Sequence, residues 1–404
     1  MTHYLDHAAT TPCVPQVLEA WMRTARDLAA HPGNPASLHG GGRRARRLLE
    51  DARAQVAQAL GAQRPEVVFT SGATEADALA VVGGARGVRS REPHRRQVLL
   101  GGADHDAVLE QAEVLSRDGM EVRILELDRD GRIQVEMLRS SHALALVSVG
   151  MVSSELGTLQ DVGDILRSAR THHPGALVHT DAAQAIPVLP VDFHTLGVDM
   201  LSVGGHKVGA PVGTGALLVR RGCPIVSDRP GGGHERGLRS GTPDVAGAVA
   251  LATALDLAAH ERERTVAHAR HLRDHLLAGL TRVCGGVVRP SISPKASSPA
   301  IIHLSLPTRH PEALLMALDT ADVHVSAGSA CHAGVTRPSQ VMLRAGRSRA
   351  EALGVLRVST GKGTTTGDID AFLSALPGAL EAARALDALD RPTGSGLTRK
   401  GGES

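Results

Sequence analysis

The fold of this chain is decided by an apolar run that ends in two glycines and a lysine: Val198-Asp199-Met200-Leu201-Ser202-Val203-Gly204-Gly205-His206-Lys207. A short apolar run before glycines predicts a buried strand over residues 199–203. Lys207 would follow this strand directly, where desolvation lowers the pKa of the amine and makes it a nucleophile toward carbonyl carbon. The alternative is a surface lysine in a turn. Lysine is rare here, at positions 207, 295, 362 and 400 only, and this scarcity isolates Lys207.

The first 250 residues show short apolar runs that alternate with amphipathic segments. The runs expected as strands are Val67-Phe69, Gln97-Leu100, Val122-Leu125, Ala143-Val149, Ala176-His179, Asp199-Val203 and Gly215-Val219. Segments 43–60 and 104–117 between them have helical patterns. This alternation predicts an α/β fold with a mainly parallel sheet covered by helices. Such sheets bind ligands at the carboxyl ends of their strands, so the residues just after each strand are candidates for chemistry.

The pattern changes after a long helix that we expect from about Val245 to Leu280. Beyond it, strands are expected over residues 300–306, 323–325 and 356–359, and helices over 311–319, 350–354 and 368 to 386. This mixture predicts a smaller C-terminal α+β domain. Residues 391–404 are rich in Gly, Ser and Thr, and we expect a disordered tail there.

Composition excludes several classes of partner. The net charge of +2 and the dispersed charges give no signature of nucleic-acid binding. No apolar stretch approaches the ~20 residues of a membrane span, and the N-terminus carries no basic and apolar leader, so a cytoplasmic protein is expected. The four cysteines lie far apart, which favours neither a zinc site nor a disulfide framework. His268, His271 and His275 would share a helical face, but a solvated helix is a better interpretation than a metal site.

Polar groups follow several of the expected strands. After residues 67–69 comes Thr70-Ser71-Gly72-Ala73-Thr74-Glu75, whose hydroxyl and backbone N–H groups at a helix start could hold a phosphate. A plain helix cap is the alternative. Asp181 follows residues 176–179 and could pair with a protonated pyridine nitrogen, while Gln184 could reach a phenolic oxygen.

His105 follows the expected strand over residues 97–100, where an imidazole could lie on the face of a cofactor ring; alone, it would be a helix-start residue. With Lys207, four separate signals therefore fall at one edge of one sheet. A lysine, a phosphate cradle, a carboxylate and an imidazole together predict a site for pyridoxal phosphate.

The chain resembles the cysteine desulfurases, class V pyridoxal-phosphate enzymes of the aspartate aminotransferase fold (fold type I). The resemblance runs from residue 4 to about 385. Its motifs are Tyr4-Leu5-Asp6-His7-Ala8-Ala9-Thr10-Thr11-Pro12, Gly33-Asn34-Pro35-Ala36-Ser37-Leu38-His39, Ser71-Gly72-Ala73-Thr74-Glu75, Asp181 with Gln184, Gly205-His206-Lys207, Gly231 to Thr242, Gly328-Ser329-Ala330-Cys331 and Arg357-Val358-Ser359. The resemblance implies an N-terminal arm (1–15) that packs with the small domain, a large cofactor-binding domain (16–257) and a small domain (258–390) that carries the catalytic cysteine loop.

The resemblance also implies roles. Lys207 would bond to the cofactor, Asp181 would hold its pyridine nitrogen and Gln184 its phenolic oxygen, and His105 would stack on its ring. The cofactor-binding set would be Ala73, Thr74, His105, Ser154, Asp181, Gln184, His206, Lys207 and, from a second subunit of a homodimer, Thr242. Asn34 and Arg357 would bind substrate, with Arg357 clamping its carboxylate. Lys207, Cys331 and His105 would be catalytic, and no metal is implied. Cys331 also lies among small residues without apolar packing, as a reactive thiol does.

The implied reaction starts when L-cysteine displaces Lys207 from the cofactor. Lys207 moves the α-proton, and the Cys331 thiolate attacks the substrate sulfur, which gives alanine and a persulfide for transfer to an acceptor protein such as an iron–sulfur scaffold or a sulfur carrier. Iron–sulfur assembly, tRNA thiolation and biosynthetic sulfur supply are the possible destinations. Two alternatives remain: a lyase for selenocysteine or another β-substituted amino acid, and a cofactor-bound scaffold for a sulfur carrier with low turnover.

Two positions depart from the family's pattern. Ser153-Ser154 stands where the family usually has two Asn before Glu-x-Gly-Thr, and Gly204 stands where it usually has a phosphate-binding Ser. The second change removes a hydroxyl donor worth about 1 kcal/mol. Neither change touches Lys207 or Cys331, so we expect them to affect rate and substrate preference rather than the class of reaction.

Overall fold

The computed structural model describes residues 2–327 and 337–389. The predicted nucleophile, Cys331, and the predicted tail over residues 391–404 both lie outside these ranges.

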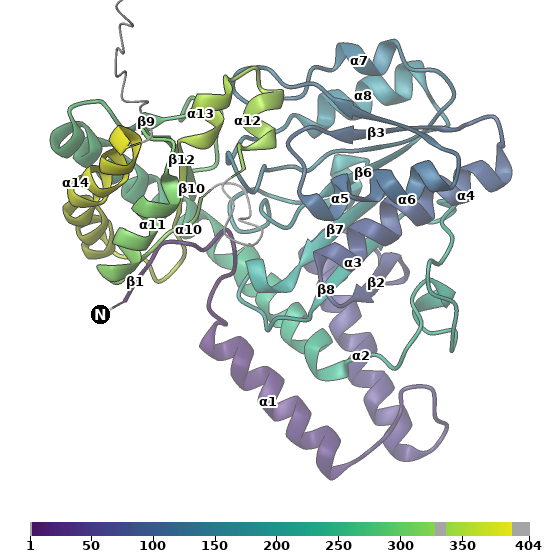
Figure 1. Ribbon diagram of the computed structural model, residues 1–404. Coiled ribbons are helices and arrows are strands. Elements are labelled where there is room, and N and C mark those ends of the chain that lie inside the picture. Colours follow the sequence, from purple (N-terminus) through teal and green to yellow (C-terminus); the bar gives the residue numbers. More distant parts are fainter. Residues whose placement is uncertain (1, 328–336, 390–404) are drawn as a thin grey trace, which may run out of the picture.

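A seven-stranded sheet forms the centre of the larger part of the molecule (Figure 1). Its order is β2 (Val67–Thr70), β8 (Gly215–Val219), β7 (Met200–Gly204), β6 (Leu177–Asp181), β5 (Leu144–Ser148), β3 (Gln97–Gly101) and β4 (Glu121–Leu125). Only β8 runs against its neighbours, so the carboxyl ends of the other strands meet at one edge. The predicted α/β fold is confirmed, and the predicted strands lie within one or two residues of the observed ones.

Helices cover both faces of this sheet. One face packs on α3 (Ala73–Ala78), α4 (Gly84–Arg91), α5 (Asp106–Leu109) and α6 (Gln111–Arg117). The other packs on α2 (Gly40–Ala59), α8 (Val162–His172) and the first part of α10 (Val245–Cys284), with α1 (Pro15–Ala30) against α10. The helix predicted over residues 104–117 is wrong in one respect: α5 and α6 are separate helices that meet at Glu110.

The short strands are apolar along their whole length because both faces of the sheet are covered by helices; β5 and β7 are buried at every residue. Polar caps begin the helices that flank them. Asp161 accepts from the backbone N–H of Asp164 at 2.9 Å at the start of α8, and Asp244 accepts from that of Gly247 at 2.9 Å at the start of α10. α10 ends at Gly285, which has a φ of +56°.

A smaller antiparallel sheet lies beside the first part, with β10 (Ile301–Ser305) between β12 (Val355–Ser359) and β9 (Arg289–Pro290). Its core joins the second part of α10 to α11 (Pro311–Thr320) and α14 (Thr366–Leu389). β1 (His3–Tyr4) pairs in parallel with β11 (Val323–His324) in this region. The remaining short helices are α7 (Glu136–Arg139), α9 (Phe193–Leu196), α12 (Gln340–Arg344) and α13 (Arg349–Leu353).

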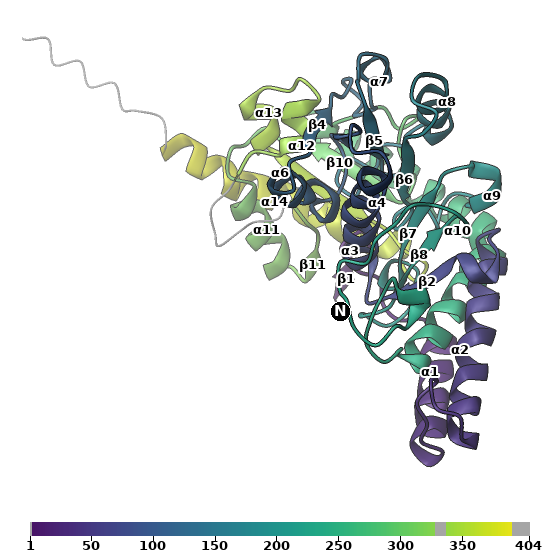
Figure 2. The same ribbon diagram turned by 90° about the vertical axis from the view of Figure 1, so that its right-hand side faces the viewer.

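α10 is one continuous helix through residues 257 and 258, where the domain boundary was placed, and it contributes to both cores. Figure 2 shows the α1 and α2 helices extending away from the smaller sheet. In residues 2–327 and 337–389, no helix combines the length and the apolar character needed to cross a membrane.

Candidate active site

Lys207 lies in a short 3₁₀ turn, Gly205–Lys207, immediately after β7. Its Nζ donates to the carbonyl oxygens of Ala8 at 2.5 Å and Ala9 at 2.7 Å. Burial lowers the pKa of Lys207 to about 8, and the positive charge of Arg357 acts in the same direction, while Asp181 and Asp6 oppose them. A much larger fraction of this amine is therefore neutral near neutral pH than for an ordinary lysine.

Asp181 ends the neighbouring strand β6, and Gln184 follows one turn later. Asp181 Oδ1 accepts from the Ala183 N–H at 2.8 Å. Burial raises the pKa of Asp181, whereas the hydrogen bond from the Ala183 N–H and the positive charge of Lys207 oppose that shift, so the carboxyl and this amine lie within electrostatic reach of one another. Gln184 Nε2 donates to Ala8 O at 2.8 Å, the oxygen that also accepts from Lys207.

Two histidines stand on the same edge. His105 is the N-cap of α5, and its Nδ1 accepts from the Ala107 N–H at 3.0 Å, which assigns the ring proton to Nε2. The residue is exposed. His206 lies next to Lys207, with Nδ1 3.1 Å from Thr10 Oγ1. Burial lowers the pKa of His206 to about 4, helped by the positive charge of Lys207, so this imidazole is neutral at pH 7.

The expected phosphate cradle lies at the end of β2. Ser71 N–H donates to Glu75 Oε2 at 2.6 Å, and Ala73 and Thr74 begin α3, with Thr74 exposed. Gly204, from β7, lies beside this turn: a Cβ at residue 204 would stand 3.2 Å from Ala73 Cβ. The end of β7 and the start of α3 therefore approach each other closely, and the structure brings the predicted cradle next to the turn that carries Lys207.

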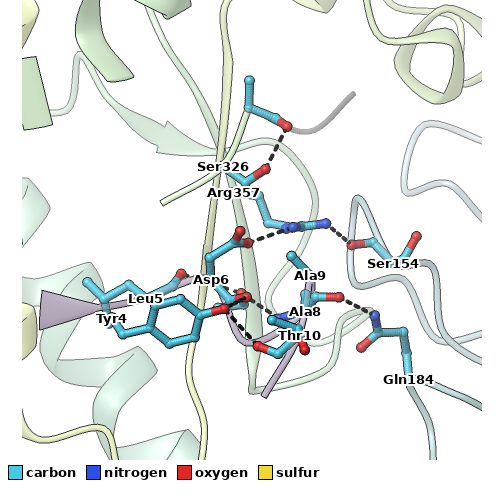
Figure 3. A network of polar contacts seen from close by, with 12 residues as sticks. Tyr4, Leu5, Asp6, Ala8, Ala9, Thr10, Ser154, Gln184, Ser326 and Arg357 are labelled. Atoms are coloured by element: carbon cyan, nitrogen blue, oxygen red, sulfur yellow. Dashed lines mark hydrogen bonds and ion pairs between the residues drawn. The ribbon is translucent and has the colours of Figure 1, made fainter. Parts of the chain in front are cut away.

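Arg357 stands on the opposite wall, in β12 of the smaller sheet (Figure 3). Its Nη2 donates to Asp6 Oδ1 at 2.7 Å and its Nη1 to Ser154 O at 2.8 Å. The guanidinium is buried, so Asp6 supplies the opposite charge that such a group requires. Ser154 thus contacts Arg357 through its backbone carbonyl.

Asn34 and Thr242 do not join these residues within the described chain. Asn34 lies in the turn between α1 and α2, where its Oδ1 accepts from the Ala36 N–H at 2.8 Å. Thr242 is exposed and makes no hydrogen bond to the described residues. Their two segments meet instead around a separate cavity of about 450 Å³, whose lining includes Pro35, Ala36, Gly233, His234, Arg236 and Pro243.

The described cysteines are poor nucleophiles. Burial raises the pKa of Cys223 to about 12, and burial also raises the pKa values of Cys13 and Cys284. A thiol attacks as its thiolate, so none of the three competes with the predicted role of Cys331.

Several residues of the site carried no signal that the sequence analysis used. Asp6 was quoted only as part of a motif, yet it is the ionic partner of Arg357.

Two carboxyl groups near Asp181, those of Asp77 and Asp104, are buried. Burial raises the pKa of Asp104 to about 8 and that of Asp77 well above its usual value. His179, two residues before Asp181, lies between Ser148 Oγ at 2.8 Å and Ser202 Oγ at 2.9 Å. The period of two along β6 could have placed His179 on the face of Asp181.

Residues 3–372 match the family described as aminotransferase class-V. The IscS-like cysteine desulfurase of Mycobacterium tuberculosis is 41% identical over 386 residues, which cover 94% of this chain and 97% of that protein. Among solved structures, a NifS-like protein superposes with a TM-score of 0.86 at 32% identity, covering 94% of this chain and 100% of that one. A structure titled "SspA in complex with cysteine" gives a TM-score of 0.76 at 28% identity, over 90% and 100% of the two chains.

The match to the family extends over most of the chain, and so do the matches to its members. The chain therefore belongs to the class-V aminotransferases and, within them, to the cysteine desulfurase family. The resemblance inferred from the sequence motifs is confirmed.

Proposed function

We propose that this protein is a pyridoxal-phosphate-dependent cysteine desulfurase, which converts L-cysteine to L-alanine and leaves the sulfur as a persulfide on Cys331. The observation that carries the proposal is a backbone pairing. Ser326 N–H donates to Arg357 O at 3.2 Å, and Arg357 N–H donates to Ser326 O at 2.7 Å. The chain therefore passes the backbone of Arg357, the residue expected to bind the substrate carboxylate, shortly before the segment that contains Cys331. Family membership supports the same reaction.

The residues at the sheet edge fit pyridoxal phosphate chemically. Lys207 offers an amine of lowered pKa, Asp181 a half-buried carboxylate with one oxygen bound to the Ala183 N–H, and His105 an exposed ring. Thr74, Ala73 and His206 would hold the phosphate, Gln184 the phenolic oxygen, and Ser154 would lie on the substrate side. When bound, the cofactor supplies an electron sink for negative charge at the substrate Cα.

The protein's own groups then perform binding and proton transfer. Arg357 would hold the substrate carboxylate, and Lys207 would move the proton at the substrate Cα, for which a pKa of about 8 suits it near neutral pH. The Cys331 thiolate attacks the substrate sulfur, the carbon–sulfur bond breaks, and its electron pair stays on the substrate's β-carbon. Protonation of that carbon gives alanine, and the sulfur remains on Cys331.

Incubation of the purified protein with pyridoxal phosphate and L-cysteine, with alanine and sulfide measured, tests the proposal. Equal amounts of the two products are expected when a thiol reductant is present. Cys331→Ser should keep cofactor binding but form no persulfide, whereas Cys223→Ser, which removes a half-buried thiol with a pKa of about 12, should remain active. The reaction assignment fails if no alanine appears.

The lyase for selenocysteine or another β-substituted amino acid is not favoured, because the relatives are named cysteine desulfurases. The low-turnover scaffold is disfavoured by the presence of both Cys331 and Arg357. Normal sulfide release from L-cysteine by Cys331→Ser would restore the lyase interpretation, since a direct elimination needs no thiol nucleophile.

The same proposal includes a homodimer with shared sites. It is supported by the place of Asn34 and Thr242, whose segments lie together around a cavity away from the site of Lys207. A second copy of the chain would bring these segments to that site. Lys207→Ala chains should be inactive, and Thr242→Ala chains should bind the cofactor more weakly. Mixing the two should give one site of full cofactor affinity in the mixed dimer if the sites are shared. A monomer with full cofactor occupancy in sedimentation contradicts this part. A cytoplasmic location and a protein sulfur acceptor belong to the same proposal.

A further inference from the structure

The first strand of the large sheet has an open edge. β2 pairs on one side with β8, and it stands last in the order of the sheet. On its other side, Val67 O and Phe69 N point away from β8, because the backbone groups of alternate residues in a strand face the same side. Such groups need partners when they are buried. β2 also leads directly into the turn 70–74 at which the cofactor phosphate is expected.

A buried ion pair supplies these partners. Arg53, from α2, donates through Nη1 to Val67 O at 2.9 Å, and Phe69 N–H donates to Glu235 Oε2 at 2.8 Å. Arg53 and Glu235 bind each other through two hydrogen bonds, of 2.6 and 2.7 Å. The guanidinium also lies over the Phe69 ring, 4.8 Å from its centroid. The pair therefore takes the place of an eighth strand along the edge of β2.

Glu235 holds its place at a conformational cost. It has a φ of +47°, and the next residue, Arg236, a φ of +60°, although neither is a glycine. Strain of this kind persists only where the surroundings determine it, and it gathers at functional sites. Two hydrogen bonds from Arg53 and one from the Phe69 N–H hold the Glu235 carboxylate here.

A second carboxylate joins the same loop to the same turn. Glu75 Oε2 accepts from the Ser71 N–H at 2.6 Å, and Glu75 Oε1 accepts from Arg239 Nε at 3.1 Å. The loop of residues 234–239 is thus tied through Glu235 to Phe69 and through Arg239 to Ser71, on both sides of Thr70. Both ties end at the start of the expected phosphate cradle.

We propose that Arg53 and Glu235 are positioning residues for the phosphate end of the cofactor site: by binding the open edge of β2 they fix the turn 70–74 against the loop 234–239. This rests on the proposed use of pyridoxal phosphate. If the proposal holds, changing Arg53 or Glu235 weakens the binding of ligands that carry the phosphate group more than the binding of ligands that lack it. A residue needed only for folding would weaken both equally.

Glu235→Gln tests the proposal, because it keeps the shape of the side chain and replaces one acceptor oxygen by a donor that faces Arg53 and Phe69. The measurement is the equilibrium binding of pyridoxal phosphate and of pyridoxal, which lacks the phosphate, to the apo protein by absorbance. We expect binding of pyridoxal phosphate to weaken by about tenfold or more and that of pyridoxal by less than about twofold. An equal loss for both ligands, or no loss for either, overturns the proposal.

Glu50→Gln is the matched control. Glu50 also accepts from Arg53, through Nε at 3.1 Å, but it is more exposed and does not touch β2. It should leave the preference for the phosphorylated ligand unchanged, and an equal loss of that preference in this control overturns the proposal too. If Glu235→Gln does not fold, Glu235→Asp keeps the charge and shortens the reach, with the same expectation. Because cysteine takes no part in these measurements, a failure to form alanine leaves this test intact.

Discussion

The two walls of the site are built in different ways. The wall at the sheet edge takes Thr74, His105, Asp181, Gln184 and Lys207 from the ends of four strands, each within a few residues of its strand. The wall that faces it joins Asp6 to Arg357, 351 residues apart in sequence, through one ion pair and the carbonyl of Ser154. The first wall is positioned by a sheet, the second by contacts between distant segments. The first should therefore govern cofactor chemistry, and the second should govern how tightly substrate is held.

The largest effect is expected at the sheet edge. Lys207→Ala removes both the bond to the cofactor and the group that moves the proton at the substrate Cα, so alanine formation should fall by at least about 100- to 10,000-fold. The fold should survive, because among the described residues Nζ donates only to the carbonyls of Ala8 and Ala9. Borohydride reduction followed by mass measurement checks the assignment, since a protein–cofactor link that persists in the variant refutes it.

Arg357→Lys tests the facing wall. A lysine cannot reach Asp6 and the Ser154 carbonyl together, and it lacks the two-pronged geometry for a carboxylate. We expect kcat/KM for L-cysteine to fall about 10- to 100-fold, mainly through KM, with cofactor absorbance unchanged. Arg347→Lys is the matched control, because Arg347 also donates to two backbone carbonyls but lies elsewhere. A fall in kcat alone would mean that this wall also takes part in the chemistry.

Lys207, on the sheet-edge wall, has its pKa shifted by the charges of Asp6 and Arg357 on the facing wall. The neutral amine is the nucleophile, and its pKa is lowered from 10.5 to about 8, so the rate of cofactor attachment to the apo protein should rise about tenfold per pH unit up to about pH 8 and then level off. Asp6 raises this pKa, so Asp6→Asn should move the midpoint to lower pH. Stopped-flow absorbance measures both. A rise that continues to pH 10 contradicts the burial of the amine.

The positions of the first wall's residues after their strands could be predicted because strand ends can be recognised locally. An apolar run, its end, and the polar residue that follows it are neighbours in the chain, as in the runs before Asp181 and Lys207. The second wall was predicted only by resemblance, because nothing near Arg357 in sequence indicates that Asp6 will pair with it. The split of residues 104–117 into α5 and α6 was missed because nothing in the local sequence marks it: Glu110, where the two helices meet, keeps helix-like angles of φ −69° and ψ −16°. Domain boundaries and site roles remain predictions.

Ser154→Asn exchanges a hydroxyl for an amide on the facing wall and leaves its hydrogen bond to Arg357 in place. Ser154 now meets Arg357 through its backbone, so an amide side chain would add a donor on the substrate side and leave that contact in place. We expect kcat/KM for L-cysteine to rise by about tenfold, which corresponds to about 1.5 kcal/mol, the low end for one hydrogen bond to a charged group. Initial rates over a range of cysteine concentrations measure it. A fall in kcat/KM would mean that the pocket around Ser154 has adapted to serine.

The smallest effect is expected at Gly204, where the sheet edge itself departs from the family. A serine there would add a hydroxyl donor near the cradle, worth about 1 kcal/mol, or about fivefold in cofactor affinity. Its Cβ, however, would stand 3.2 Å from Ala73 Cβ and 3.5 Å from Ala183 Cβ, so the start of α3 must move to admit it. The gain and the crowding oppose each other, and Gly204→Ser should change the affinity for pyridoxal phosphate by less than about threefold.

The double variant Gly204→Ser with Ala73→Gly separates the gain of a hydroxyl donor from the crowding at α3, because Ala73→Gly removes the Cβ that lies nearest to the new side chain. Its affinity should exceed that of Gly204→Ser alone, as measured by absorbance titration of the apo protein. If Gly204→Ser by itself strengthens the binding of pyridoxal phosphate about tenfold, the backbone at the sheet edge moves to admit the new side chain at little energetic cost. The difference between a wall fixed by strands and a wall held by distant contacts would then not extend to the phosphate end of the site.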